Sequence, residues 1–316
     1  MSIAGKTDTG KKRGMNEDSF HAEIISNIHL AVVCDGVGGA KAGEVASAIG
    51  VSSFVETFKK LLDSKELPLP PSNAKEDIKD ANIKSNKGSK STKNDDKNKN
   101  DKNDENDKND ENYFKDILVS SVAKANDDIY TASAENKDIR GMGTTMVACV
   151  FDKDANEYYA VNVGDSRLYI INGVNGENQE ITQITKDHSL VQDLVDSGAL
   201  TKEQAEKSPN KNIITRVLGM DDAVEVDFYR DKYESGIFLL CSDGLSDYVS
   251  ERDIVKFVSH IHMGNTGKLD NMDNMENMDK TENIGDMDIE NCLTNLISKA
   301  NENGGGDNIT AVIIKP

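Results

Sequence analysis

Four aspartates stand where apolar, strand-like segments of the chain begin or end. They are Asp35, Asp165, Asp243 and Asp307. An acidic pair in the sequence RGMNEDS, Glu17 and Asp18, lies near the N-terminus. One Asp-Gly dipeptide by itself indicates only a turn. If two packed sheets bring these corners together, however, Asp35, Asp243, Asp307 and Glu17 form a cluster of like charges, which stays ionised only with cations between the carboxylates.

The type of donor indicates which cation such a cluster would bind. Carboxylate oxygens without a His or Cys pattern favour Mg²⁺ or Mn²⁺ over Zn²⁺. The glycine-rich run DGVGGAKAGE, which starts at Asp35, would let backbone approach a metal ion, and the carbonyl of Gly36 is a candidate ligand. The five histidines show no metal-ligand spacing and are assigned to surface or packing roles: His21, His29, His188, His260 and His262.

One basic residue stands close in sequence to the acidic pair. Arg13 lies four residues before Glu17. A guanidinium beside a metal site makes sense if a dianionic group must be held across both, and phosphate is such a group. On its own, Arg13 would be interpreted as a surface residue.

Composition and charge narrow the class of protein. The chain has 316 residues, of which 36% are hydrophobic, enough for a sizeable core. Its formal net charge of −19 argues against a nucleic acid or an anionic membrane as the main partner. The N-terminal residues lack the apolar core of a signal peptide, Ser2 stands where myristoylation would require glycine, and no apolar stretch approaches a membrane span. We therefore expect a soluble intracellular protein, cytoplasmic or otherwise, with its four cysteines reduced and buried.

Two polar segments interrupt the globular pattern. Residues from about 72 to 112 are almost entirely Asn, Lys, Asp, Glu and Ser, and residues from about 263 to 290 repeat Asn, Met and Asp. Neither composition can form a core, so both segments are expected to be disordered insertions. Because the globular pattern resumes after each of them, residues 1–316 are predicted to form a single domain.

The remaining segments predict an alternation of strands with a few helices. Strands are predicted at Ala22–Ser26, Ile28–Cys34, Thr144–Phe151, Glu157–Val163, Arg167–Ile171, Ala223–Tyr229, Gly236–Cys241 and Asn308–Ile314. Helices are predicted at Ala42–Ser64, Tyr113–Ala134, Ser189–Ser197, Thr201–Lys207, Glu251–His262 and Asp288–Asn303. The strand segments follow one another through short turns. This order favours antiparallel sheets with packed helices over a doubly wound parallel sheet.

Eight motifs, taken in order, resemble those of the metal-dependent protein phosphatases, the PPM or type 2C serine/threonine phosphatases, and especially their bacterial-type branch. The motifs are RGMNEDS, VCDGVGGAKAGEVAS, GMGTTMVA, VGDSRLY, ITKDHSLVQDLVDSGALT, ITRVLG, LLCSDGLSDYVS and GGGDNITAVI. The resemblance covers the whole chain outside the two insertions. It implies an α+β fold, a four-layer αββα sandwich of two antiparallel central sheets flanked by antiparallel helices.

The resemblance also implies two Mn²⁺ or Mg²⁺ ions in the active site, at one end of the sandwich. Carried over by motif, Asp35 would bridge the two ions. Asp243 and Asp307 would complete the first site, whereas Glu17 and the carbonyl of Gly36 would complete the second.

Further residues take their roles from the same resemblance. Asp18 would hold metal-bound water by hydrogen bonds. Asp165, together with Asp243, would bind a third and weaker ion, which Asn212 would also approach. Arg13 would bind the phosphate of the substrate.

The implied activity is the hydrolysis of phosphoserine and phosphothreonine in proteins. A hydroxide that bridges the two ions attacks phosphorus in line with the leaving oxygen, without a covalent enzyme intermediate. Many animal members carry a His after the Asp-Gly pair, whereas this chain has Val37. Bacterial-type members also lack that His, so we expect activity to survive. The segment Val191–Ile214 corresponds to a flap that influences substrate choice, with a plain surface helix-turn-helix as the alternative.

Two other functions remain open at this stage. One is a phosphatase-like scaffold whose disordered arms recruit partners, although degenerate members of the family usually lose an acidic ligand and this chain keeps them all. The other is hydrolysis of a small phosphorylated metabolite, which keeps the chemistry and changes the substrate. The resemblance makes a monomer the default.

Overall fold

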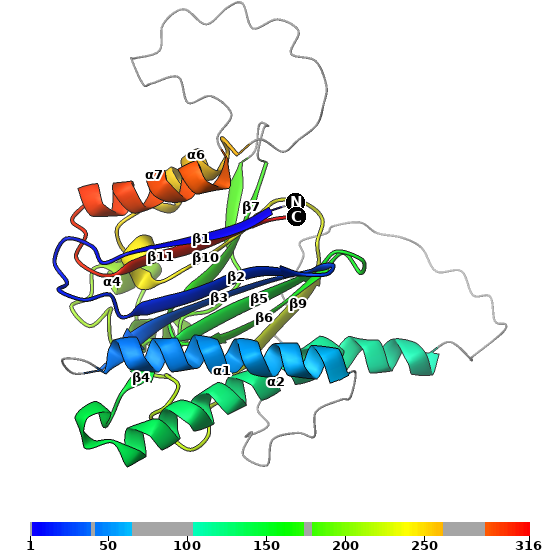
Figure 1. The fold of residues 1–316 in the computed structure, drawn as a ribbon. Coiled ribbons are helices and arrows are strands. Elements are labelled where there is room, and N and C mark those ends of the chain that lie inside the picture. Colours follow the sequence, from blue (N-terminus) through cyan, green and yellow to red (C-terminus); the bar gives the residue numbers. More distant parts are fainter. Residues whose placement is uncertain (1, 39–41, 65–103, 174–178, 262–287) are drawn as a thin grey trace, which may run out of the picture.

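Two antiparallel sheets lie face to face in the computed structural model, which describes residues 2–38, 42–64, 104–173, 179–261 and 288–316 (Figure 1). The first sheet has the strand order β1-β11-β10-β7-β8, and the second has the order β2-β3-β5-β6-β9 with β4 paired to β3. The strands of the first sheet are β1 (Ser2–Asp8), β11 (Ile309–Lys315), β10 (Ile237–Cys241), β7 (Arg167–Asn172) and β8 (Glu180–Gln183). Those of the second sheet are β2 (Asp18–Ile25), β3 (Ile28–Val37), β4 (Gly143–Thr144), β5 (Met146–Asp152), β6 (Glu157–Val163) and β9 (Asp227–Lys232).

Helices cover the outer face of each sheet. The long helices α1 (Gly43–Ser64) and α2 (Asp104–Glu135) lie along the second sheet, and α6 (Glu251–Val258) and α7 (Ile289–Glu302) lie on the first (Figure 1). The shorter helices are η1 (Lys137–Ile139), α3 (Leu190–Asp196), α4 (Lys202–Glu206) and α5 (Asp243–Ser246). The described residues therefore form four layers, and the expected αββα sandwich is confirmed.

The side chains of β3 contribute to the apolar clusters on both faces of the second sheet. Ala31 and Val33 belong to the apolar cluster between the two sheets, whereas Leu30, Val32 and Cys34 face the opposite way, into the cluster beneath α1 and α2. All five side chains are completely buried. A strand covered on both faces reads as a continuous apolar run, which is why its position was easy to predict.

The strands that sequence analysis missed or misplaced lie at the edges of the sheets. β1 and β8 are the two edge strands of the first sheet and were not predicted. β9, an edge strand of the second sheet, begins at Asp227 rather than at the predicted Ala223. Edge strands bury less of their surface, so their apolar alternation is weak and their pairing depends on distant partners.

The two predicted insertions fall mostly outside the described residues. Where the structure does describe their ends, both ends are helical. Residues 104–112 form the first turns of α2, and the stretch around residue 288 begins α7, with Asp288 as its N-cap. Helix α2 therefore begins earlier than the predicted Tyr113, whereas α7 begins where the helix Asp288–Asn303 was predicted. A helix that has already formed from Tyr113 onward can extend even through a run rich in Asp and Asn, because propagation is easier than nucleation.

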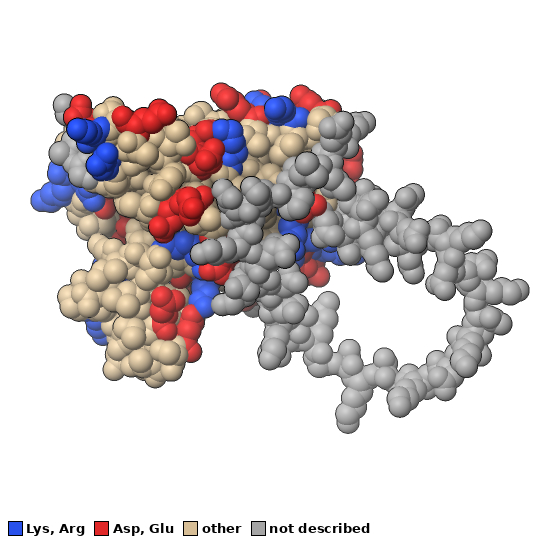
Figure 2. Space-filling view, turned by 90° about the horizontal axis from the view of Figure 1, so that it is seen from below, with Lys and Arg blue, Asp and Glu red and all other residues tan. Residues whose placement is uncertain are grey.

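The described surface is polar and its cysteines are internal. All four cysteines are buried and free, as predicted. On the face shown in Figure 2, Asp and Glu are interspersed with Lys and Arg. No helix in the part of the chain that the structure describes is long and apolar enough to cross a bilayer.

The corners that carry the predicted acids meet at one end of the sandwich. In the second sheet, Asp18 at the start of β2 lies opposite Asp35 near the end of β3. In the first sheet, Cys241 at the end of β10 pairs with Ala311 near the start of β11, so Asp243 and Asp307 flank the same edge. The strand order thus brings together residues that are up to about 290 positions apart in sequence.

The core between the sheets supports this edge, and its contribution can be measured. Leu240 is completely buried between the two sheets, so we expect Leu240→Ala to lower the free energy of unfolding by about 2–5 kcal/mol. Urea denaturation followed by circular dichroism measures the change. Ile24→Ala is the matched control, because Ile24 is 46% exposed and its truncation should change stability by less than about 0.5 kcal/mol. Equal losses for the two variants would contradict the assigned core.

Candidate metal centre and active site

Asp35 is held at the end of β3 by hydrogen bonds on both sides of its backbone. Its N–H donates to Thr145 Oγ1 at 3.0 Å. Its carbonyl accepts from the Thr145 N–H and from Thr144 Oγ1, each at 2.9 Å. The backbone is therefore fixed before the carboxylate makes any contact of its own, which is how a strand end can present a charged side chain at a defined place.

A buried hydrogen bond ties the two sheets together beside Asp35. Ser242 Oγ donates to Asp18 Oδ2 at 2.7 Å and accepts from the Thr310 N–H at 3.0 Å. Ser242 directly precedes Asp243, and Thr310 follows Asp307 by three residues. The corner of the first sheet that carries two of the predicted ligands is thus joined to the first residue of β2.

The carboxylates at this edge strongly perturb one another. Burial raises the pKa of Asp35 well above its usual range, and the charges of Asp18 and Asp243 raise it further. Burial, followed by the charge of Asp165, has the same effect on Asp243. Burial also raises the pKa of Asp18 to about 6 and that of Asp165 to about 7. Buried like charges of this kind are stable as anions only when positive charge comes between them.

The available donors fit a hard divalent cation. Buried oxygens of three aspartates, Asp18 Oδ1, Asp165 Oδ1 and Asp243 Oδ1, have no hydrogen-bond partner among the described residues. Such atoms are costly to bury unless a ligand satisfies them, and carboxylate oxygens suit Mg²⁺ or Mn²⁺. These side chains are not, however, already arranged as a complete set of ligands around one ion. Within the described ranges, no three or more His, Cys, Asp or Glu side chains are grouped so that they could hold one ion.

Two glycines allow the start of α1 to approach the end of β3. A Cβ on Gly36 would lie 2.1 Å from the Gly43 carbonyl oxygen and 2.6 Å from that of Glu17. A Cβ on Gly43 would lie 2.9 Å from the Glu17 carboxylate. The Gly36 N–H donates to the Glu17 carbonyl at 3.1 Å. Glycine is therefore needed here for close packing of three backbone segments, which also brings the Gly36 carbonyl near Glu17.

Arg13 stands at the exposed side of the acidic edge. Its Nη2 donates to Asp307 Oδ2 at 2.9 Å, and its Nη1 lies 3.6 Å from Glu17 Oε2. The side chain remains 45% exposed, so the guanidinium is open to a ligand from solvent while two acids orient it. This placement agrees with its predicted position beside the acids.

Asn308 holds the loop that carries Arg13 and Glu17, a role that sequence analysis missed. Its Nδ2 donates to the carbonyls of Thr9 at 2.9 Å and Met15 at 2.8 Å. Its Oδ1 accepts from the Glu17 N–H at 2.8 Å. The signal was its place directly after Asp307, since an amide can satisfy both donors and acceptors of a loop backbone.

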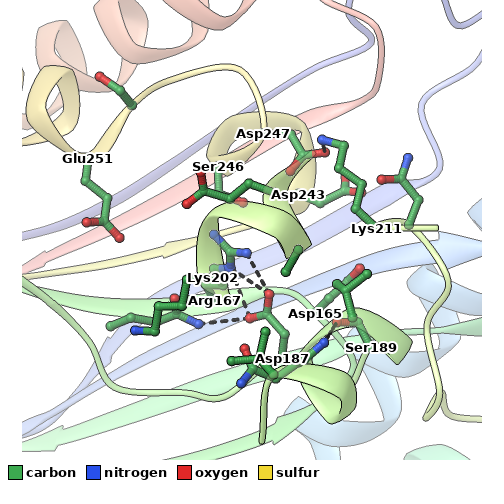
Figure 3. A pocket seen from close by; sticks show the side chains of 18 of the residues that line it. Asp165, Arg167, Asp187, Ser189, Lys202, Lys211, Asp243, Ser246, Asp247 and Glu251 are labelled. Atoms are coloured by element: carbon green, nitrogen blue, oxygen red, sulfur yellow. Dashed lines mark hydrogen bonds and ion pairs between the residues drawn. The ribbon is translucent and has the colours of Figure 1, made fainter. Parts of the chain in front are cut away.

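A polar pocket of about 570 Å³ opens beside Asp165 and Asp243 (Figure 3). Asn212 lines the same pocket. In the pocket wall, Arg167 Nε and Nη2 donate hydrogen bonds of 2.6 to 3.0 Å to the Asp187 carboxylate. The pocket wall also includes residues of α3 and α4, the two helices of the segment Val191–Ile214 that was predicted as a flap.

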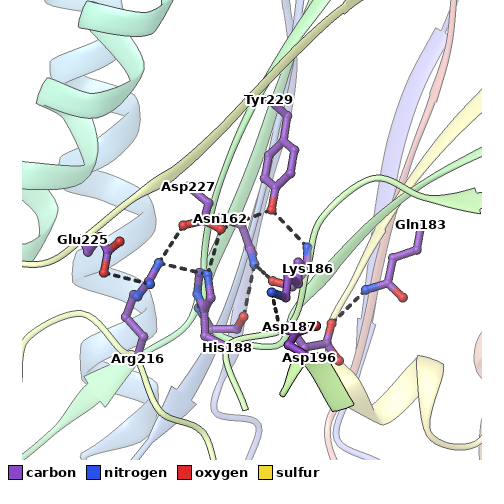
Figure 4. A network of polar contacts seen from close by, with 11 residues as sticks. Asn162, Gln183, Lys186, Asp187, His188, Asp196, Arg216, Glu225, Asp227 and Tyr229 are labelled. Atoms are coloured by element: carbon purple, nitrogen blue, oxygen red, sulfur yellow. Dashed lines mark hydrogen bonds and ion pairs between the residues drawn. The ribbon is translucent and has the colours of Figure 1, made fainter. Parts of the chain in front are cut away.

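The surroundings of His188 were not predicted from the sequence. It was assigned to a surface or packing role, but it is buried at the centre of a polar network with Gly164, Arg216 and Asp227 (Figure 4). The other side chains in this network come from segments far apart in sequence, so spacing alone could not reveal it. His29, in contrast, is buried against Phe151, as a packing role predicts.

The family follows from comparison with known proteins. A family model described as "Protein phosphatase 2C" matches residues 9–274. The chain belongs to this family. Its relatives are named serine/threonine phosphatases, and the chain is a phosphoprotein phosphatase of the bacterial PPM type.

The relatives extend over most of this type 2C chain. Serine/threonine phosphatase stp of Listeria monocytogenes serotype 4b is 29% identical over 100% of this chain and 96% of that protein. Serine/threonine protein phosphatase PstP of Mycobacterium tuberculosis is 30% identical over 81% of this chain and 38% of that protein.

Solved structures of the family have the same fold. The Staphylococcus aureus serine/threonine phosphatase Stp1 matches with a TM-score of 0.65, 28% identity, and coverage of 99% of this chain and 95% of that chain. The catalytic domain of the phosphatase PstP, solved with two manganese ions, matches with a TM-score of 0.61, 27% identity, and coverage of 99% and 96%.

The raised carboxyl pKa values predict how the metal-free phosphatase responds to pH. A carboxyl whose folded pKa is raised contributes stability below its unfolded pKa of about 3.9, and this contribution is lost as pH rises through the folded value. With Asp18 at about 6 and Asp165 at about 7, the free energy of unfolding in EDTA should fall between about pH 4 and pH 7.

Asp165→Asn removes one of these charges and tests the cause directly. At pH 8 in EDTA it should raise the free energy of unfolding, on the order of 2 kcal/mol. Urea denaturation at several pH values measures this, and the exposed Asp222→Asn serves as the control. A variant whose stability falls with pH as steeply as that of the parent protein would contradict the assignment.

Proposed function

We propose that this phosphatase hydrolyses phosphoserine and phosphothreonine in proteins with the help of two divalent cations, Mn²⁺ or Mg²⁺, bound at the acidic end of the sandwich. The observation that supports this best is the set of buried, unpartnered carboxylate oxygens on Asp18, Asp165 and Asp243. The exposed guanidinium of Arg13 stands beside them. Cations and a guanidinium at one edge suit a phosphate dianion.

The carboxylates divide into two candidate sets. In this proposal Asp35 is shared by both ions, and Asp243 and Asp307 hold the first. Glu17 and the Gly36 carbonyl hold the second. Their support is topological, because β3, α5 and the loop that leads into β11 meet at one edge, and hydrogen bonds hold the backbone of Glu17 there.

A third, weaker ion is proposed at Asp165 and Asp243, close to Asn212. Asp165 is 8% exposed and its Oδ1 has no partner in the described part of the chain. All three residues line the pocket beside the acidic edge.

The chain's own groups have distinct tasks in the reaction. When bound, the two ions would supply positive charge that lowers the pKa of a water molecule and offsets the charge of the phosphate, so that hydrolysis needs no covalent intermediate. Asp18 Oδ1 is available to accept a hydrogen bond from the attacking water, since Oδ2 is already occupied by Ser242. Arg13 binds the non-bridging phosphate oxygens and orients the phosphorus for in-line attack.

The proposal extends to the organisation of the whole chain. It includes one catalytic domain over residues 1–316, acting as a monomer inside the cell. Polar segments at about 72–112 and 263–290 interrupt this domain, and the first of them ends within α2. Its substrates are phosphoproteins rather than nucleic acids or membranes, in keeping with the net charge of −19.

Metal dependence and the ligand assignment are tested together. Phosphate release from a phosphothreonine peptide should require added Mn²⁺ or Mg²⁺ and stop in EDTA. Asp243→Asn should lower kcat at least about 100-fold, which is more than about 2.7 kcal/mol of transition-state stabilisation. The exposed Asp222→Asn should keep the parent rate. Turnover that persists in EDTA, or in Asp243→Asn, would rule out the proposed centre.

The role of Arg13 has its own test. Arg13→Ala should lower kcat/KM for the same peptide about 10- to 150-fold, because charge-assisted hydrogen bonds contribute about 1.5–3 kcal/mol. Arg13→Lys should recover only part of the loss, since lysine lacks the planar fork. Arg140→Ala, at another exposed arginine, is the control. Unchanged kinetics in Arg13→Ala would show that phosphate binds elsewhere.

A further inference from the structure

His188 lies where the two ends of the α3–α4 segment come together. The His188 carbonyl accepts from the Thr215 N–H at 2.8 Å, and Leu190 N–H donates to the Ile213 carbonyl at 2.9 Å. Ser189 and Ile214 form an isolated antiparallel bridge between these contacts. The entry and exit of the segment are therefore closed into a short ladder, and His188 sits at its base.

The hydrogen bonds of the imidazole fix its protonation pattern. Nδ1 lies 3.0 Å from the Gly164 backbone nitrogen, which can only donate a proton, so Nδ1 must be the acceptor. Nε2 lies 2.9 Å from Arg216 Nη1 and 3.2 Å from Asp227 Oδ2. In the neutral ring the proton is then on Nε2, and of these two neighbours only the Asp227 carboxylate can accept a hydrogen bond from it. Asp227 thus accepts from Nε2 and holds the ring in the tautomer that Gly164 requires (Figure 4).

Asp227 is itself firmly placed. Arg216 Nη1 donates to Asp227 Oδ1 at 2.8 Å, and Arg216 Nη2 donates to Glu225 at 3.0 Å. Burial acts to raise the pKa of Asp227, but the hydrogen bonds from His188 and Arg216 and the charge of Arg216 prevail and lower it to about 2. Asp227 is therefore an anion at neutral pH, and the imidazole faces a carboxylate that is paired with the Arg216 guanidinium.

His188 also forms hydrogen bonds with the backbone of the turn that carries Asp165. The His188 N–H donates to the Gly164 carbonyl at 2.9 Å while Nδ1 accepts from the Gly164 N–H, so both backbone groups of Gly164 bind the same residue. Asn162 Nδ2 donates to the Gly164 carbonyl as well, at 3.1 Å. Gly164 has a φ of 109°, and a Cβ there would lie 2.6 Å from Thr145. The turn has little room to move, and the next residue is Asp165.

We propose that His188 is a positioning residue that, oriented by Asp227, holds the Gly164–Asp165 turn so that the Asp165 carboxylate faces the pocket it shares with Asp243. The inference rests on the proposed role of Asp165 as a ligand of the third cation. It predicts that the Nδ1 acceptor of His188 sets the affinity of that weakest ion. It also links the ion to the α3–α4 segment, because the same residue closes the base of that segment.

A pair of amide substitutions separates this role from simple packing. Asn places an oxygen close to the position of Nδ1, so His188→Asn keeps an acceptor for the Gly164 N–H and loses the contact with Asp227. Gln places its amide near Nε2, so His188→Gln keeps a donor for Asp227 and leaves the Gly164 N–H without its acceptor. Both variants are polar and smaller than or similar in size to His, so a general loss of packing should affect them alike.

The readout is Mn²⁺ binding to the full chain, measured from the electron paramagnetic resonance signal of free Mn²⁺ and independent of turnover. Asp165→Asn should lose the weakest ion and keep the tighter ones. His188→Gln should raise the dissociation constant of the weakest ion about 10- to 100-fold, as is usual for residues that orient a ligand, whereas His188→Asn should stay near the parent value. In the Asp165→Asn background, His188→Gln should have no further effect.

Three results would overturn the inference in distinguishable ways. If His188→Gln and His188→Asn weaken the ion equally, or neither does, His188 does not act through its Nδ1 acceptor. If His188→Gln still weakens the remaining ions in the Asp165→Asn background, its effect does not pass through Asp165. If Asp165→Asn loses no ion, the proposed third site and the role of His188 fall together, while the proposal for the two tighter ions is judged separately by Asp243→Asn.

Discussion

Repulsion among buried carboxylates at one end of the sandwich is the constraint on which the rest of this structure depends. Burial and neighbouring negative charge both oppose ionisation of Asp35 and Asp243 and raise their pKa values. A chain can keep such groups together only if other interactions fix their backbones. Here strand pairing, the Thr144 and Thr145 contacts of Asp35, and three apolar layers supply that support. Binding of a cation would relieve the repulsion among these carboxylates, so the fold favours cation binding at this edge.

The two sheets contribute complementary halves of this edge, and two polar side chains help to join these halves. Ser242 bridges from the end of the first sheet to Asp18 in the second. The Asn308 side chain holds the loop that crosses from β1 to β2, and this loop carries Arg13 and Glu17. Relative movement of the sheets would therefore separate the candidate ligands of the proposed ions. This explains why an uncharged layer of interlocked side chains between the sheets matters for a site made of charged groups.

The pocket side of the edge is built differently from the Arg13 side. Arg13 is nearly half exposed and is oriented by Asp307 and Glu17. Asp165, in contrast, is carried on a turn that His188 and Asn162 hold through the backbone of Gly164. His188 also closes the base of the α3–α4 segment, whose residues line the pocket. His188 therefore contacts both the turn that carries Asp165 and the α3–α4 segment. Through these contacts, a change in the position of one can shift the position of the other.

The sequence alone determined the features that depend on local pattern. β3 and β6 could be predicted because continuous apolar runs mark strands buried on both faces, and the acids at strand ends identified the edge that carries the site. The edge strands β1 and β8, the Ser242–Asp18 bridge, the Asn308 contacts and the His188 network appeared only in the tertiary structure. The physical reason is the same in each case. Their partners lie far away in the chain, and a polar group's role depends on which distant donor or acceptor folding brings beside it, which no local spacing encodes.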